Sequence, residues 1–122
     1  MKKDTVLVLG ASANPNRYAY LASQLLLKKG YKVALVGIRS GQIGELKIET
    51  DRSIILPHID TITMYVGPKN QPEWYDYILQ TQPRRIIFNP GTENTELSEK
   101  AQEKGIECIE ACTLVMLQTG QF

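Results

Sequence analysis

Histidine and cysteine are scarce in this chain, and their scarcity excludes several kinds of chemistry. The 122 residues include one histidine, His58, and two cysteines, Cys108 and Cys112. The cysteines are not spaced as a zinc pair or as a redox C-x-x-C motif, so no metal site is expected. We expect both cysteines to serve packing, because no residue beside Cys112 would stabilise a thiolate. No role is assigned to His58, which follows Pro57 in an expected surface connection.

The chain also lacks an excess of charge of either sign. Fourteen Lys and Arg oppose thirteen Asp and Glu, for a formal net charge of +1. The densest basic pairs, Lys2-Lys3, Lys28-Lys29 and Arg84-Arg85, belong to different predicted elements and form no basic stripe. Nucleic acid is therefore not an expected partner. A small anionic ligand needs only one or two cations.

Long hydrophobic runs are missing as well. The first apolar run, residues 6–9, is too short for a membrane span or for the core of a signal peptide. We therefore expect a cytoplasmic protein with reduced thiols and no membrane partner. The length fits one domain over residues 1–122, and 43% hydrophobic with 22% charged residues is typical of a soluble globule.

What the chain does contain is a regular alternation of short apolar runs with amphipathic stretches, which is typical of βαβ units around a parallel sheet. The first run is apolar throughout, as in a central strand covered on both faces. Five strands are predicted, over residues 5–9, 32–38, 61–66, 85–88 and 106–109. The sequence thus predicts a three-layer, doubly wound, Rossmann-like α/β domain with a five-stranded, mainly parallel sheet.

Helices are predicted between these strands. Apolar residues at helical spacing over residues 18–26 predict the first helix, and Gly30 is placed to end it in the left-handed conformation. Asn70 and Glu73 match a capping box for a second helix, and Asn94 is placed to cap a third.

Two segments are less regular. Residues 37–44 hold three glycines and are expected to form a crossover loop with at most a short strand or helical turn. Residues 113–118 are expected to form a short final helix.

The turn after the first predicted strand carries the main functional signal. It reads Gly10-Ala11-Ser12-Ala13-Asn14-Pro15-Asn16-Arg17. Small residues let backbone N–H groups approach a phosphate, and the start of the following helix adds a partial positive charge. Ser12 can donate a hydrogen bond, and Arg17 can bind a phosphate oxygen. The turn matches neither G-x-G-x-x-G nor the Walker A loop, and a polar connection with a solvated Arg17 remains the alternative.

Arg39 supplies an independent signal. In NAD-binding versions of this fold an acidic residue after the second strand binds the ribose hydroxyls, whereas an arginine accommodates a ribose phosphate. Arg39 and Ser40 follow the second predicted strand, and no acid occurs before Glu45. CoA and NADP each carry an additional ribose phosphate, so Arg39 favours either over NAD without choosing between them. An exposed loop arginine is the alternative.

Further candidates follow from the rule that doubly wound sheets bind ligands at the carboxyl ends of their strands. Residues 66–68 could form a flat apolar wall against adenine or ribose, or could merely end a strand. Residues 89–92 offer an amide, a hydroxyl and a glycine N–H suited to a diphosphate, or form a cap-and-turn segment. The predicted ligand-binding residues are Gly10, Ala11, Ser12, Asn16, Arg17, Gly37, Arg39, Ser40, Gly67, Pro68, Asn89, Pro90, Gly91 and Thr92.

Residues 10–18 and the step Lys29-Gly30-Tyr31-Lys32-Val33 resemble the free-standing CoA-binding domain family. Members of this family are similar to the nucleotide-binding domain of the succinyl-CoA synthetase alpha subunit. The later order of strands, turns and a late cysteine runs in register, so the resemblance covers nearly the whole chain.

This chain departs from the family pattern at three places. Residues 37–40 stand where the family usually has an Asn-Pro step, Asn89 stands where it usually has glutamine, and Ala111 precedes Cys112 where an arginine is common. These changes concern the identity of the ligand more than the fold.

The function expected from the residues and the resemblance is that of a non-catalytic nucleotide-binding protein whose ligand is coenzyme A or an acyl-CoA. No catalytic residue is predicted, because Ser12 has no available base except His58, which lies after an unrelated segment. The alternatives are an NADP-binding reductase, a nicotinamide-sensing module, or a docking subunit of a larger CoA-using enzyme. Association into a homo-oligomer or with a partner enzyme is left open.

Overall fold

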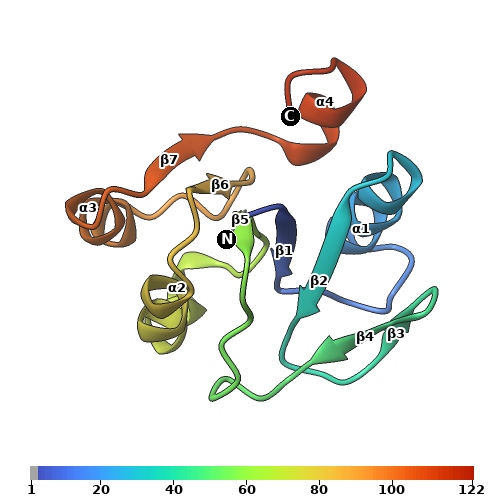
Figure 1. Ribbon diagram of the computed structural model, residues 1–122, viewed down its shortest axis with the longest axis horizontal. Coiled ribbons are helices and arrows are strands. Elements are labelled where there is room, and N and C mark those ends of the chain that lie inside the picture. Colours follow the sequence, from blue (N-terminus) through green and yellow to red (C-terminus); the bar gives the residue numbers. More distant parts are fainter. Residues whose placement is uncertain (1–2) are drawn as a thin grey trace.

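The computed structural model describes residues 3–122 and shows a twisted sheet with helices on both faces (Figure 1). The strands are β1 (Thr5–Leu9), β2 (Lys32–Val36), β3 (Gln42–Ile43), β4 (Leu46–Glu49), β5 (Ile59–Met64), β6 (Arg85–Phe88) and β7 (Glu107–Glu110). The helices are α1 (Tyr18–Lys28), α2 (Tyr75–Thr81), α3 (Thr95–Glu103) and α4 (Thr113–Gln118), and two 3₁₀ turns, η1 (Pro68–Asn70) and η2 (Pro72–Trp74), precede α2.

The order of the strands creates a crevice beside β1. The sheet runs β3-β4-β2-β1-β5-β6-β7, and every neighbouring pair is parallel except β3 with β4. The chain builds outward from β1 in one direction through β2 and β4, and in the other through β5, β6 and β7. In such sheets the point of reversal leaves a crevice at the carboxyl ends of the strands. The predicted α/β, mostly parallel architecture is confirmed.

The predicted number of five strands is wrong, because the sheet has seven. The two additional strands form a hairpin over residues 42–49, within and just beyond the segment expected to be a loop. Gly44, with φ of +60°, occupies the two-residue turn between them, where a left-handed conformation suits a tight hairpin. Strands this short carry too little alternation to stand out in sequence, and β4 is stabilised by parallel pairing with β2.

Each face of the sheet has its own apolar core. Alternate residues of β1 point to opposite faces, so Val6 and Val8 pack toward α1 and α4, whereas Leu7 and Leu9 pack toward α2 and α3. Figure 1 shows the two pairs of helices on opposite sides of the strands. Burying each such side chain stabilises the fold by about 1.5–3 kcal/mol. The rigid sheet holds the turns at its carboxyl end in place.

The ends of the helices confirm two of the predicted caps and correct a third. The side chain of Asn94 accepts a hydrogen bond from the Leu97 N–H at 3.1 Å and caps α3, and Gly30 follows α1 with φ of +88°. Asn70 does not cap α2, which begins at Tyr75 without a side-chain cap. The capping box fails because Pro68 and Pro72 each begin a 3₁₀ turn, which suits a residue without an N–H.

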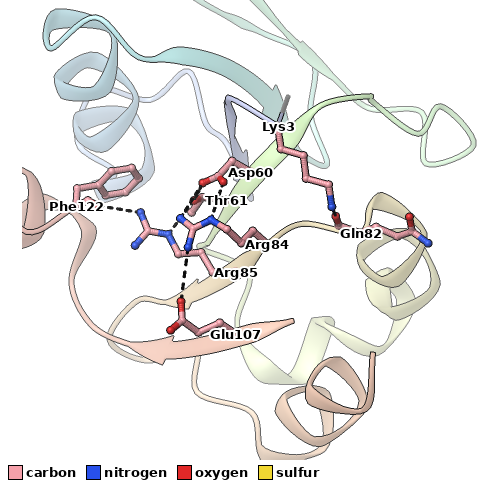
Figure 2. A network of polar contacts seen from close by, with 8 residues as sticks. All are labelled: Lys3, Asp60, Thr61, Gln82, Arg84, Arg85, Glu107 and Phe122. Carbon is pink, nitrogen blue, oxygen red and sulfur yellow. Dashed lines mark hydrogen bonds and ion pairs between the residues drawn. The ribbon is translucent and has the colours of Figure 1, made fainter. Parts of the chain in front are cut away.

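The amino ends of β5, β6 and β7 hold a network of charged side chains, drawn in Figure 2. Arg84 donates to both carboxylate oxygens of Asp60, from Nε at 2.8 Å and from Nη2 at 3.2 Å. Arg85 is only 7% exposed and donates to the Thr61 hydroxyl at 2.9 Å and to the Phe122 carbonyl at 3.1 Å. These two arginines lie at the end of the sheet opposite the crevice and are engaged in structural contacts.

Candidate functional site

A cleft of about 850 Å³ opens at the carboxyl end of the sheet. Its lining comes from the turn after β1, the start of α1, and the segments that follow β2, β5 and β6. Its volume lies within the range of about 300–1,000 Å³ that is usual for ligand pockets. The crevice expected from strand order is therefore a real cavity, and the turn after β1 faces it.

Close backbone packing holds the turn after β1 in place. The N–H groups of Gly10 and Ala11 both donate to the Val36 carbonyl, at 2.9 and 3.0 Å. Gly10 has φ of +93°, and a Cβ there would lie 2.9 Å from the carbonyl carbon of Tyr65. A Cβ on Gly37 would lie 2.6 Å from the Ala11 carbonyl oxygen. Glycine at both positions lets the turn pack against β2 and against the residues after β5.

The same turn leaves several backbone donors without an acceptor. Ser12 Oγ accepts from the Asn14 N–H at 3.1 Å, and Asn14 Oδ1 accepts from the Asn16 N–H at 3.0 Å. These local bonds curl the turn and use two of its amides. Within residues 3–122, the N–H groups of Ser12 and Ala13 have no protein acceptor, and neither do those of the first two residues of α1. Such groups at a helix start form a natural anion site.

The electrostatics of the cleft are set by two arginines. Among the described residues that line it, Arg17 and Arg39 are the only charged ones. Both are exposed, and neither guanidinium group makes an ion pair or hydrogen bond with the described part of the chain. The cleft therefore carries positive charge that no carboxylate of its lining neutralises, and it is suited to an anionic ligand.

The opposite wall is formed by the segments after β5 and β6. Tyr65, Val66 and Gly67 line it from one segment, and residues 90–92 from the other. Burial raises the pKa of Tyr65 to about 12, so its hydroxyl stays protonated at neutral pH. A Cβ added at Gly67 would have no neighbouring atom within 4 Å, so that position is open to the cleft.

Ten of the fourteen predicted ligand-binding residues lie together in the lining of this cleft. They are Gly10, Ala11, Ser12, Arg17, Arg39, Ser40, Gly67, Pro90, Gly91 and Thr92. The binding role assigned to them stays a prediction, but the structure places them around one cavity.

The other four, Asn16, Gly37, Pro68 and Asn89, are not part of the lining. Asn89 is 2% exposed, and its amide is used inside the protein. It donates to the Thr63 hydroxyl at 2.8 Å and to the Met64 carbonyl at 2.9 Å, and it accepts from the Thr113 N–H at 2.8 Å. Asn89 thus supports the floor of the cleft by joining β5, β6 and α4.

Eight lining residues were not among the fourteen predicted ligand-binding residues. They are Ala13, Asn14, Tyr18, Ala19, Ile38, Tyr65, Val66 and Asn70. Ala13 and Asn14 lie in the turn that carried the functional signal, and Val66 belongs to the wall predicted at residues 66–68, so sequence reasoning missed the other five. Tyr18 and Ile38 are large apolar side chains that are 72% and 67% exposed at the cleft. Each adjoins a predicted arginine in sequence, at Arg17 and Arg39. An apolar residue beside an arginine predicted to bind the ligand is the signal that could have indicated both.

The remaining sequence features lie elsewhere. Cys108 is half-buried against the core beneath α2 and α3, and burial raises the pKa of its thiol. In the portion that the structure describes, no three His, Cys, Asp or Glu side chains gather as ligands for a metal ion. Between residues 3 and 122, none of the helices has the length and apolar character needed to cross a membrane.

Solved structures share this fold over nearly its whole length. A crystal structure of an uncharacterized protein is 44% identical, with a TM-score of 0.94 and full coverage of both chains. A hypothetical protein from Pyrococcus horikoshii OT3 is 27% identical, with a TM-score of 0.84 over 97% of this chain and 83% of that one. The dinucleotide-forming acetyl-coenzyme A synthetase 1 of Ca. Korarchaeum cryptofilum shares the fold at 18% identity, with a TM-score of 0.74 over 90% of this chain and 26% of its own.

The curated proteins include none that matches the chain. The family described as CoA binding domain matches residues 4–118. This match confirms the resemblance carried by residues 10–18 and 29–33, and it extends over nearly all of the sequence. The chain belongs to the CoA binding domain family.

Proposed function

We propose that this protein binds coenzyme A or an acyl-CoA in the cleft beside β1, as a nucleotide-binding protein without catalytic activity of its own. The observation that carries the proposal is the pair Arg17 and Arg39, the only charged residues in the described lining, neither of them paired with a carboxylate. Coenzyme A presents a ribose phosphate and a diphosphate, and so needs cations at two places. Membership in the CoA binding domain family supports the same ligand.

The lining residues suggest how such a ligand would be held. Arg17 and the unpaired amides of Ser12 and Ala13 are suited to the diphosphate, because they combine a guanidinium with N–H donors at a helix start. Arg39 with Ser40 is suited to the ribose phosphate. The pantetheine arm would extend toward residues 90–92. Coenzyme A itself would supply the thiol or thioester.

We propose binding without catalysis because the described lining holds no carboxylate, imidazole or thiol to serve as base or nucleophile. The hydroxyl of Tyr65, with a pKa of about 12, is a hydrogen-bond donor rather than a base at neutral pH. The protein would then carry, store or sense the ligand.

Two other functions have an observation in their favour. Arg39 suits the 2′-phosphate of NADP as well as the 3′-phosphate of coenzyme A, which would suit an NADP-binding reductase or a nicotinamide-sensing module. The exposed side chains of Tyr18 and Ile38 at the cleft would suit a docking subunit of a larger CoA-using enzyme. The ligand measured in solution separates the first of these from the leading proposal.

The test compares four ligands, CoA, dephospho-CoA, NADP and NAD, by titration calorimetry on the wild-type protein and on Arg39→Ala and Arg17→Ala. Losing a hydrogen bond to a charged group costs about 1.5–3 kcal/mol, or roughly 10- to 150-fold in affinity. We expect CoA to bind tighter than dephospho-CoA by such a factor, and we expect Arg39→Ala to remove that preference. Arg17→Ala should weaken the binding of both CoA and dephospho-CoA.

Lys47→Ala is the matched control, because Lys47 is an exposed cation outside the cleft lining. It should leave all affinities unchanged, which would show that loss of net charge alone does not explain the arginine variants. Tighter binding of NADP than of CoA would move the assignment to the nicotinamide alternative. If the wild-type protein bound none of the four ligands, the proposal would be refuted.

A further inference from the structure

The cleft wall formed after β5 and β6 is held together by one buried side chain, that of Gln71. This residue lies between η1 and η2 and is 0% exposed. Its Nε2 donates to the Val66 carbonyl at 2.8 Å and to the Thr92 carbonyl at 2.7 Å. Val66 lines the cleft from the segment after β5, and Thr92 lines it from the segment after β6. A single amide group therefore joins the two segments.

The orientation of this amide is set from its other side. Gln71 Oε1 accepts from Asn94 Nδ2 at 2.8 Å. Asn94 Nδ2 also donates to the Tyr75 hydroxyl at 2.9 Å, while Asn94 Oδ1 accepts from the Leu97 N–H and caps α3. A primary amide offers two donors and an acceptor in one plane, and Gln71 uses all three. Neither a carboxylate nor an alkyl group of the same size could make these bonds.

Other cross-links between the two segments are scarce, which gives Gln71 its importance. Pairing of β5 with β6 ends at Met64 and Phe88, so the sheet ladder does not reach the cleft wall. Asn89 adds a bond to the Met64 carbonyl at the end of the ladder. Beyond that point, no backbone hydrogen bond in residues 3–122 joins residues 65–67 to residues 90–92. Within residues 3–122, the hydrogen bonds that join these two segments are therefore those of Gln71.

We propose that Gln71 is a positioning residue that fixes the separation of the segments after β5 and β6, and so selects a ligand long enough to span from the arginine side of the cleft to this wall. The inference rests on the function proposed above. Without the two bonds from Nε2, the segments that carry Val66 and Thr92 would lose the hydrogen bonds that join them, and the wall that faces the part of the ligand beyond the diphosphate would shift. In this proposal the wall that includes Val66 faces the pantetheine arm and not the adenine or ribose, so the nucleotide end, held by the turns after β1 and β2, would not be affected.

The experiment compares two ligands on one variant. Gln71→Met keeps the length of the side chain, removes its three hydrogen bonds and adds no charge. CoA reaches both sides of the cleft, whereas adenosine 3′,5′-bisphosphate has phosphates but no pantetheine arm. We expect Gln71→Met to weaken CoA by about tenfold or more, the scale of losing one or two buried hydrogen bonds, and to leave the bisphosphate unchanged. Gln80→Met is the control, since Gln80 is an exposed residue of α2 outside the cleft lining.

A second variant, Gln71→Glu, tests the hydrogen bonds themselves. Its ionised carboxylate has no donor for the two carbonyls, whereas its protonated form regains one O–H donor. The CoA affinity of Gln71→Glu, divided by that of Gln80→Glu, should therefore rise as the pH is lowered. The Gln80→Glu reference removes the titration of the ligand phosphates from the comparison.

The outcomes separate the two proposals. A wild-type protein that binds neither ligand refutes the proposed function. If the wild type binds both, and Gln71→Met weakens both equally or neither, the role of Gln71 is overturned while the proposed function stands. The role of Gln71 is likewise overturned if the ratio of the CoA affinities of Gln71→Glu and Gln80→Glu does not change with pH. Failure of both Gln71 variants to fold would assign this residue to folding alone and also overturn the inference.

Discussion

Substituting Gly37 by alanine should destabilise the protein by displacing the turn that faces the cleft. The added Cβ would lie 2.6 Å from the Ala11 carbonyl oxygen and 3.2 Å from Cγ2 of Ile48. An ordinary contact lies at 3.4 Å or more, and the nearer atom is backbone, so the turn must move by several tenths of an ångström. Overpacking of this kind costs about 1–3 kcal/mol.

The assay is thermal or denaturant unfolding, followed by a CoA titration. A loss of 1 kcal/mol lowers Tm by roughly 3–5 °C for a chain of this size, so Gly37→Ala should unfold about 3–15 °C earlier. Since Ala11 lies in the cleft lining, ligand affinity should fall as well.

Two other glycines serve as matched controls for this substitution. Gly30 has φ of +88° and open space around it, so Gly30→Ala adds backbone strain of about 1–2 kcal/mol without a clash. It lies at the far end of α1 and should leave ligand affinity unchanged despite a similar loss of stability. Gly67 has neither a positive φ nor a close neighbour, and Gly67→Ala should not alter stability. If Gly37→Ala matched the wild type in both stability and affinity, the tight packing of Ala11 against Gly37 would be refuted.

Two further predictions concern the stability of the fold. Hydrogen bonding to Arg84 holds the pKa of Asp60 below its ordinary value of 3.8, so the unfolded state takes up the proton first, and the contribution of this pair is lost as the pH falls below about 4. Asp60→Asn should flatten the acid limb of stability measured by urea unfolding between about pH 4 and 2, and an unchanged acid limb would contradict this reasoning. Asn94→Ala should destabilise the protein by at least about 0.5–2 kcal/mol, because it removes the α3 cap and also the hydrogen bonds to Gln71 and Tyr75, and the loss would be measured as a lower denaturant midpoint with an unchanged m-value. A midpoint equal to that of the wild type would show that the Leu97 N–H is satisfied by water instead.

Much of the fold was predictable because the strands and helices follow apolar patterns of residues that are close together in the sequence. The bounds of β1, at Thr5–Leu9, and of β6, at Arg85–Phe88, agree with their apolar runs. The final helix, Thr113–Gln118, also agrees with its predicted range. The short hairpin of β3 and β4 was not predictable, because two- and four-residue strands owe their existence to pairing with each other and with β2.

The site was predictable in part for the same reason. The turn after β1 has a distinctive local composition, and the structure places Ser12 and Arg17 in the cleft lining. Asn89 shows the limit of such reasoning. In the sequence, an amide side chain after a strand is equally suited to bind a ligand or to form hydrogen bonds within the protein. Only the structure shows that the Asn89 amide is hydrogen-bonded to Thr63, Met64 and Thr113.

By itself the sequence determined the α/β alternation, the position of the turn after β1 and the family, because each depends on residues that are neighbours along the chain. Only the tertiary structure decided which turns share one cavity, which arginines remain unpaired, and that Gln71 joins Val66 to Thr92. The physical reason is that hydrogen bonds and ion pairs form between groups that are close in space. Arg84 and Arg17 are alike in sequence terms, but Asp60 binds one, and no side chain of the described residues binds the other.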